Sequence, residues 1–233
     1  MQARLAARDI ACRRGERLLF AGLSLTLGPG EALHVTGANG VGKSSLIRIL
    51  AGLLRPFAGA VEREGAAGLI DERHALDPEV PLGEALRFWQ ALDGGEVPLD
   101  RLGLADLLDV PVRFLSTGQK KRAALARLMA QRAPIWLLDE PLNGLDSKGV
   151  ALVENLIAEH LSGGGLAVIA SHQPLASDAK ELALAEFAAH SPSRCPSGTA
   201  SLPGEGVGGW GLSASGSALI PHPHPSPEGE GLS

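Results

Sequence analysis

Apolar and polar residues alternate along the first 35 positions in the period-two pattern of β-strands. Leu23, Leu25 and Leu27 alternate with small polar residues, and a Gly-Pro-Gly turn separates them from a second apolar segment that ends at Val35. Over residues 44–54 the apolar positions recur at helical spacing instead. The pattern therefore predicts strands, a glycine-rich loop and a helix in succession.

Further along the chain, predicted helices alternate with short apolar runs. Runs that are apolar at every position favour parallel strands buried on both faces, and we expect such strands at residues 135–138 and 166–170. Residues 59–68 are predicted to form a hairpin. Helices are expected at residues 82–92, 99–108 and 148–161, and after Gly118. This alternation predicts an α/β fold.

The composition limits the kinds of protein that the chain can be. It has 233 residues, of which 45% are hydrophobic, and a net charge of −5, which suits one compact domain plus an extension. The chain has no long block of like charge, which argues against a nucleic-acid partner held by phosphate contacts. No apolar stretch reaches the ~18 residues of a membrane span. Cys12 and Cys195 imply no disulfide framework. We expect a reduced, cytosolic protein.

The composition changes near residue 189. Residues 190–233 are rich in glycine, proline and serine and show no apolar periodicity, so they bury too little surface to offset the entropy of folding. We therefore predict a folded domain at residues 1–189, with a helical subdomain at about 75–130, followed by a disordered tail.

A phosphate-binding loop is indicated by residues 37–44, which fit G-x-x-x-x-G-K-[ST] between a predicted strand and a predicted helix. In such a loop, backbone N–H groups and the helix N-terminus bind phosphate oxygens. Lys43 should bridge the β- and γ-phosphates, Ser44 should bind Mg²⁺, and Ser45 should reach the α-phosphate. The predicted nucleotide contacts of this segment are Gly37, Ala38, Asn39, Gly40, Val41, Gly42, Lys43, Ser44 and Ser45.

Candidate catalytic residues follow the two predicted parallel strands. Asp139 and Glu140 come after the first strand, at the edge of the sheet where α/β folds bind ligands. Asp139 should hold Mg²⁺, and Glu140 should orient or deprotonate the attacking water. His172 follows the second strand. Taken alone, the two carboxylates also fit a charged strand terminus, and His172 fits a structural histidine.

A fourth motif, Leu-Ser-Thr-Gly-Gln at residues 115–119, resembles the signature of ATP-binding cassette (ABC) ATPases. In chain order, the phosphate loop, this signature, the Asp139-Glu140 pair and His172 resemble that family over about residues 3–187. The resemblance implies a P-loop NTPase, the ABC nucleotide-binding domain, with a RecA-like parallel-sheet core, a small antiparallel β part and a helical subdomain. It also implies that ATP and Mg²⁺ are bound, that His172 contacts the γ-phosphate, and that Glu140, His172 and Lys43 carry the hydrolysis.

In this family two cassettes bind head to tail, so the resemblance also implies a homodimer. Ser116, Gly118 and Gln119 would contact the γ-phosphate held by the opposite protomer, and a two-fold dimer would form two sites from one sequence. Asp146 matches a loop that crosses the interface. Asp146 also fits the N-cap of the following helix, and the two roles are compatible.

Three stretches, at residues 12–20, 37–40 and 171–175, resemble the ATP-binding subunits of the cytochrome c maturation haem exporters. That resemblance implies a peripheral ATPase on the cytoplasmic face of the inner membrane. It would power haem export or haem-chaperone release through integral-membrane subunits of the CcmB or CcmC kind. The alternatives are an exporter of another cargo, a soluble ABC ATPase acting on DNA or ribosomes, and a nucleotide-binding module without turnover. The presence of both Glu140 and His172 argues against the last.

The sequence departs from the family pattern at three places. Arg13 and Arg14 stand where many cassettes place an aromatic residue that stacks on adenine, so the expectation is either stacking by a guanidinium plane or weak selectivity for the base. The usual glutamine between the subdomains is missing, and Glu72 or Arg73 is the expected substitute. Thr117 replaces a common glycine of the signature.

Overall fold

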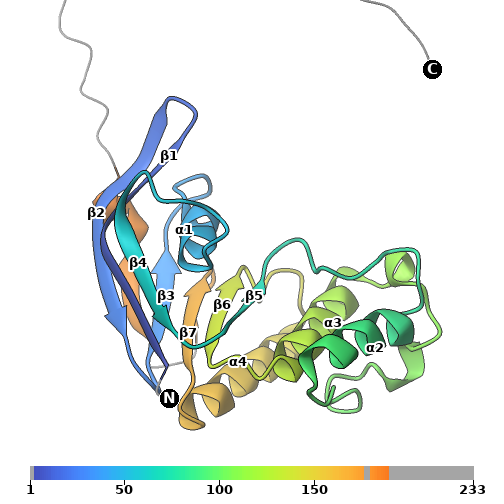
Figure 1. Cartoon of the computed structure of the whole chain (residues 1–233). Coiled ribbons are helices and arrows are strands. Elements are labelled where there is room, and N and C mark those ends of the chain that lie inside the picture. Colours follow the sequence, from blue (N-terminus) through green and yellow to red (C-terminus); the bar gives the residue numbers. More distant parts are fainter. Residues whose placement is uncertain (1–2, 176–178, 189–233) are drawn as a thin grey trace, which may run out of the picture. The chain divides into compact units, whose positions relative to one another are not determined.

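Two β-sheets make up the scaffold of the protein (Figure 1). The computed structural model describes residues 3–175 and 179–188, and the predicted tail lies outside these ranges. The antiparallel sheet has the order β2-β1-β4 and consists of β1 (Arg4–Arg14), β2 (Arg17–Leu27) and β4 (Ala58–Glu64). The parallel sheet has the order β5-β6-β7-β3-β8 and consists of β3 (Ala32–Thr36), β5 (Ala67–Ile70), β6 (Ile135–Asp139), β7 (Leu166–Ala170) and β8 (Lys180–Ala183).

The central strands of the parallel sheet are buried on both faces, as their uniformly apolar sequences predict. In β6, Ile135 and Leu137 pack into one hydrophobic core with α1 (Lys43–Leu50) and the antiparallel sheet, whereas Trp136 and Leu138 pack into a second core. The helices that contribute to this second core are α2 (Leu82–Asp93), α3 (Thr117–Ala130) and α4 (Ser147–Ser162). The parallel sheet is thus covered on both faces (Figure 1).

The hairpin predicted at residues 59–68 is wrong. The strands in this range, β4 and β5, belong to different sheets: Ala7 faces Val61 in the antiparallel sheet, and Gly68 faces Trp136 in the parallel sheet. Gly65, with a φ of +110°, lies in the short connection between them. A hairpin and two strands of different sheets have the same local sequence pattern of strand, glycine turn and strand. The sequence pattern could not distinguish them, because the pairing partners of β4 and β5 are distant in sequence.

The helix predicted at residues 99–108 is also wrong. The structure contains only the 3₁₀ turn η1 (Ala105–Leu107) in this range, because Gly103 adopts a left-handed φ of +59° that interrupts a helix. Leu102 and Leu104 are fully buried. The apolar spacing in this stretch therefore reflects burial of the loop rather than helical structure.

The helix ends have identifiable causes. Helix α1 ends before Gly52, whose φ is +77°, and so is shorter than the predicted 44–54. A capping box begins α3, with the Ser116 hydroxyl accepting from the Gln119 N–H (3.2 Å) and the Gln119 side chain accepting from the Ser116 N–H (2.8 Å). Asp146 caps α4 by accepting from the Gly149 N–H at 2.8 Å. The described residues hold two further 3₁₀ turns, η2 (Val112–Phe114) and η3 (Leu184–Phe187), and no helix long and apolar enough to cross a membrane.

Candidate functional site

The phosphate loop connects β3 to α1 through a series of left-handed glycines. Gly37, Gly40 and Gly42 have φ values of +143°, +80° and +115°, which side chains with a Cβ rarely adopt. Gly42 is the N-cap of α1 and supplies no side-chain acceptor, so the first N–H groups of the helix are available to an anion. Lys43 is 6% exposed and its Nζ donates to the Gly37 carbonyl at 2.7 Å. The ammonium is therefore held over the loop.

A buried carboxylate lies beside this loop at the end of β6. Asp139 is 5% exposed, and its Oδ1 has no hydrogen-bond partner. Burial raises the pKa of Asp139, although a hydrogen bond from the Ser44 hydroxyl opposes that shift. The described residues contain no cluster of three or more His, Cys, Asp or Glu side chains that could hold a metal by itself. Ser44 and Asp139 suit Mg²⁺, which binds through one or two protein oxygens together with substrate phosphates.

Two of the predicted residues, Lys43 and His172, converge on the carboxyl group of a third, Glu140. The Glu140 Oε1 lies 3.6 Å from the Lys43 Nζ, and the Glu140 Oε2 lies 2.9 Å from the His172 Nδ1. β6 and β7 are adjacent, and the Glu140 N–H donates to the Ala170 carbonyl at 2.8 Å. The adjacency of the two strand ends therefore brings Glu140 and His172 together across 32 positions of sequence.

A cavity of about 460 Å³ is lined by half of the predicted site residues. Gly37, Ala38, Val41 and Asp139 do not line it, although the Gly37 carbonyl holds Lys43. Sequence reasoning missed Leu19 and Asn143, which do line it. Asn143 lies three positions after Glu140 in the same loop, which was an available signal. The predicted residues that line the cavity are Asn39, Gly40, Gly42, Lys43, Ser44, Ser45, Glu140 and His172.

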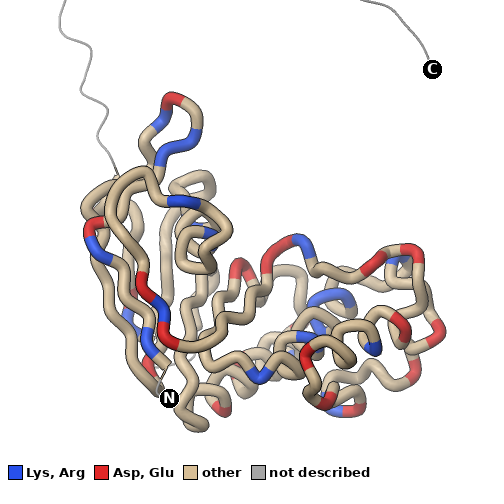
Figure 2. Tube along the Cα trace, viewed as in Figure 1, with Lys and Arg blue, Asp and Glu red and all other residues tan. Residues whose placement is uncertain are grey.

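The structure distinguishes the residues that the sequence left as alternatives. Arg14 lines the cavity, whereas the Arg13 guanidinium lies 4.5 Å from the centre of the Phe57 ring. Both belong to the charged β1–β2 hairpin (Figure 2). Glu72 also lines the cavity and Arg73 does not. The backbone N–H of Arg73 donates to an Asp71 carboxylate oxygen at 2.9 Å.

The signature residues lie in a different part of the chain's surface. Ser116, Gly118 and Asp146 line a separate cavity of about 580 Å³, and they do not line the cavity of Lys43. The Gln119 side chain is engaged in the capping box of α3. The expected N-cap role of Asp146 is present. Within one chain, the two groups of predicted nucleotide contacts therefore remain apart.

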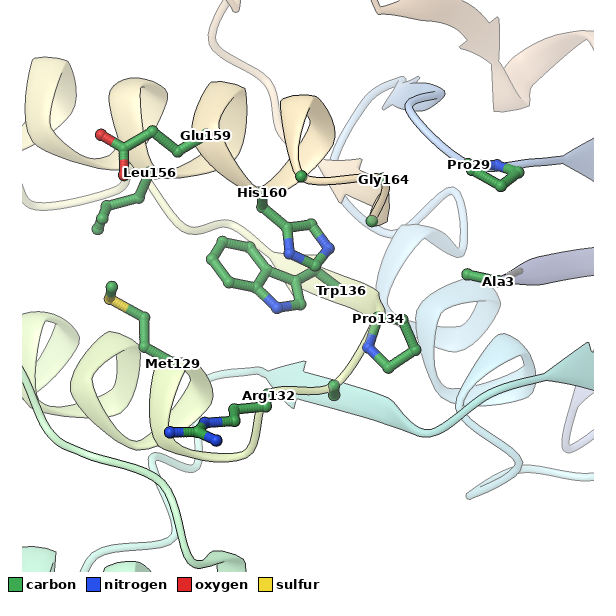
Figure 3. A pocket seen from close by; sticks show the side chains of 13 residues that line it. Ala3, Pro29, Met129, Arg132, Pro134, Trp136, Leu156, Glu159, His160 and Gly164 are labelled. Atoms are coloured by element: carbon green, nitrogen blue, oxygen red, sulfur yellow. The ribbon is translucent and has the colours of Figure 1, made fainter. Parts of the chain in front are cut away.

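A larger cavity, of about 640 Å³, lies at the amino ends of the parallel strands (Figure 3). Pro134 and Gly165, which precede β6 and β7, line it together with Trp136 and His160. The Trp136 and His160 rings are stacked with centroids 4.0 Å apart. Parallel α/β sheets bind their ligands at the carboxyl ends of the strands, and none of the predicted site residues lines this cavity.

Comparison with known proteins identifies the class that this fold and site define. A family model described as ABC transporter matches residues 20–143, slightly more than half of the chain. A solved ATP-binding subunit of an ABC transporter has a TM-score of 0.65 and 23% identity, and the match covers 72% of this chain and 79% of that one. The fold is thus confirmed as an ABC nucleotide-binding domain. The chain belongs to the ABC transporter family and is an ABC-type ATPase.

Its close relatives are more narrowly named. The Novosphingobium aromaticivorans protein "Cytochrome c biogenesis ATP-binding export protein CcmA" is 61% identical over 184 residues, which are 78% of this chain and 96% of that protein. The protein of the same name from Zymomonas mobilis is 50% identical, with 81% of this chain and 88% of that protein covered. The resemblance to the cytochrome c maturation group is thereby confirmed.

Proposed function

We propose that this chain is the ATP-hydrolysing subunit of a membrane complex that exports haem, or releases a haem chaperone, during c-type cytochrome biogenesis. One observation carries the ATPase part: Lys43 and His172 both approach the Glu140 carboxylate beside the phosphate loop. The names of the CcmA relatives, which specify ATP binding, export and cytochrome c biogenesis, support the biological part. The complex would hold this subunit on the cytoplasmic face of the inner membrane.

The roles of the residues follow from their positions. Lys43 and the N–H groups at the start of α1 would bind the β- and γ-phosphates. Ser44 and Asp139 would hold Mg²⁺, which when bound neutralises charge on the phosphates. Glu140 would accept a hydrogen bond from the attacking water and orient it. His172, which contacts the same carboxylate, would reach the γ-phosphate.

The nucleoside would lie against the antiparallel sheet. Arg14 and Leu19 line the cavity from β1 and β2, whereas Glu140 and His172 follow strands of the parallel sheet. Ser45, which is expected at the α-phosphate, also lines the cavity. The Arg14 guanidinium would therefore stack on the base, because Arg13 is already engaged with Phe57.

Dimerisation would complete the site. Ser116, Gly118 and Asp146 lie outside the cavity of their own chain, so a head-to-tail partner is needed to bring them to the γ-phosphate. The N-terminus of α3, capped through Gln119, would then direct its N–H groups at the partner's nucleotide. A two-fold dimer satisfies both sites at once.

The membrane subunits, of the CcmB or CcmC kind, would dock on the helical part. A cavity of about 350 Å³ there is lined by Ala75, Phe88 and Trp89 among others, and Phe88 is 64% exposed. Ala75 lies three positions after Glu72, which lines the nucleotide cavity. A helical segment of a membrane subunit seated here would thus contact the same loop that reaches the nucleotide.

A strain that carries Lys43→Ala as its sole copy tests the proposal. Without the Lys43 ammonium, the phosphates lose their principal protein counter-charge, so periplasmic c-type cytochromes should lack covalent haem while b-type cytochromes are still made. A haem-stained gel reads this out, with immunoblotting to verify protein abundance. Lys180→Ala is the matched control, since that exposed lysine pairs with Glu31 and does not line the cavity. Normal c-type bands in the Lys43→Ala strain would favour export of another cargo.

A further inference from the structure

The backbone of Glu140 adopts an unfavourable conformation. Its φ is +48°, in the left-handed region that non-glycine residues rarely occupy. Pro141 follows directly, and the ring of a proline restricts the preceding residue to extended conformations. Residues held in such conformations cost free energy, and they persist where the surrounding structure fixes them. The contacts that fix Glu140 are therefore part of how its carboxylate is aimed.

Three hydrogen bonds hold the backbone N–H and carbonyl groups of Glu140. The Glu140 N–H donates to the Ala170 carbonyl at 2.8 Å, and the Asn143 N–H donates weakly to the Glu140 carbonyl at 3.4 Å. The third donor is the Lys121 ammonium, which reaches the same Glu140 carbonyl from α3. Lys121 is thus the side chain that ties this strained peptide to a separate helix.

Lys121 occupies an unusual environment for a lysine. Burial lowers its pKa, although the carboxylates of Glu140, Asp139 and Glu72 oppose that shift. Within the described ranges no salt bridge involves Lys121, whose ammonium donates to the backbone carbonyl instead of to any of these carboxylates. A half-buried cation that only balanced the acidic groups would be expected to contact one of them.

We infer that Lys121 is a positioning residue, which holds the Glu140 peptide in its left-handed conformation and so directs the carboxylate between Lys43 and His172. This inference rests on the proposed role of Glu140 in hydrolysis. Helix α3 begins at the signature motif. One rigid helix therefore carries both the residues proposed to face the partner's nucleotide and the lysine that fixes the water-orienting carboxylate.

Lys121→Met removes the donor and retains most of the length of the side chain, up to the position of Cε. The turnover number should fall on the order of tenfold or more, because hydrogen bonds from charged groups are among the stronger ones and this one bears on the reacting carboxylate. The affinity for ATP should change by less than about twofold, since the phosphate loop is untouched. Lys121→Arg, which restores a cationic donor, should recover part of the turnover.

Lys120→Met is the matched control. Lys120 is the neighbouring lysine on α3, and its Nζ donates to the Arg113 carbonyl at 3.2 Å, away from Glu140. The control therefore loses the same charge and the same kind of bond, and it should retain wild-type turnover. Melting temperatures of all variants, measured alongside, separate a loss of positioning from a loss of folded protein.

A Glu140→Gln background separates this inference from the proposed function. In that background Lys121→Met should lower the residual hydrolysis no further, because the carboxylate that Lys121 positions is already gone. Wild-type turnover in Lys121→Met alone, or an equal loss in both backgrounds, overturns the positioning role. If instead Glu140→Gln alone hydrolyses ATP at the wild-type rate, the proposed role of Glu140 in hydrolysis is wrong.

Discussion

Replacing Asp139 with asparagine should stabilise the protein without ligands and abolish its response to Mg²⁺. The Asp139 side chain is 5% exposed, its Oδ1 lacks a partner, and burial raises its pKa. A buried polar group left unpaired costs about 1–3 kcal/mol, and more if it is charged. The amide of the variant can still accept from the Ser44 hydroxyl but carries no charge to desolvate.

The size and the pH dependence of this effect follow from the burial of Asp139. If the substitution recovers about 1–2 kcal/mol of that cost, the melting temperature of a domain of this size rises by about 2–8 °C. Because the pKa of Asp139 is raised in the folded state, protonation stabilises the fold below the unfolded pKa of about 3.9. That stabilisation is lost as the pH rises through the folded pKa. The advantage of the variant should therefore be greatest near neutral pH and vanish in acid.

Thermal unfolding between about pH 4 and pH 8 in the presence of a chelator measures this effect, with Mg²⁺-ATP added in a second series. The nucleotide complex should stabilise the wild type strongly and the variant weakly. Asp109→Asn, at an exposed position, is the control and should change the stability by less than about 0.5 kcal/mol. A variant that melts at or below the wild-type temperature at every pH would refute the reasoning.

Three further predictions concern other parts of the structure. Ser116→Ala removes the capping box of α3, so it should cost about 1 kcal/mol in the free energy of unfolding by urea and weaken ATP-dependent dimerisation; unchanged values would contradict the cap. Arg14→Ala should weaken ATP binding about 3- to 10-fold and leave inorganic tripolyphosphate binding unchanged in calorimetry, whereas Arg13→Ala should do neither. His160→Phe tests the half-buried His160, whose pKa is lowered by desolvation. Stability should be full above the unfolded pKa of about 6.5 and fall as the pH drops through the lowered folded pKa; the variant should show less of this loss.

Local motifs made the chemical part of the site predictable. The phosphate loop works through its own glycines and the helix that follows it, so Lys43 and Ser44 could be assigned from a continuous segment. Asp139 and Glu140 could be placed because parallel strands expose their carboxyl ends at one edge. His172 could be assigned only through the resemblance to the ABC family, and the structure adds that the two apolar runs before Glu140 and His172 are the adjacent strands β6 and β7.

Long-range contacts made the remainder inaccessible to sequence reasoning. Leu19 lines the cavity because β2 passes beside Gly42. The apolar periodicity of the sequence does not predict this contact between distant segments. The contact between Lys121 and the Glu140 carbonyl joins a helix to a strand end across 19 positions. The wrong hairpin prediction also results from long-range contacts, because β4 and β5 pair with strands that are distant in sequence and belong to different sheets.

The most direct test of the account is sedimentation of Glu140→Gln with Mg²⁺-ATP, combined with a hydrolysis assay. The substitution removes the water-orienting carboxylate and leaves Lys43 and Ser44 in place, so binding should survive while the chemical step fails. We expect a stable dimer with nucleotide trapped at both sites and almost no release of phosphate. A variant that remains monomeric and hydrolyses ATP at the wild-type rate would contradict it.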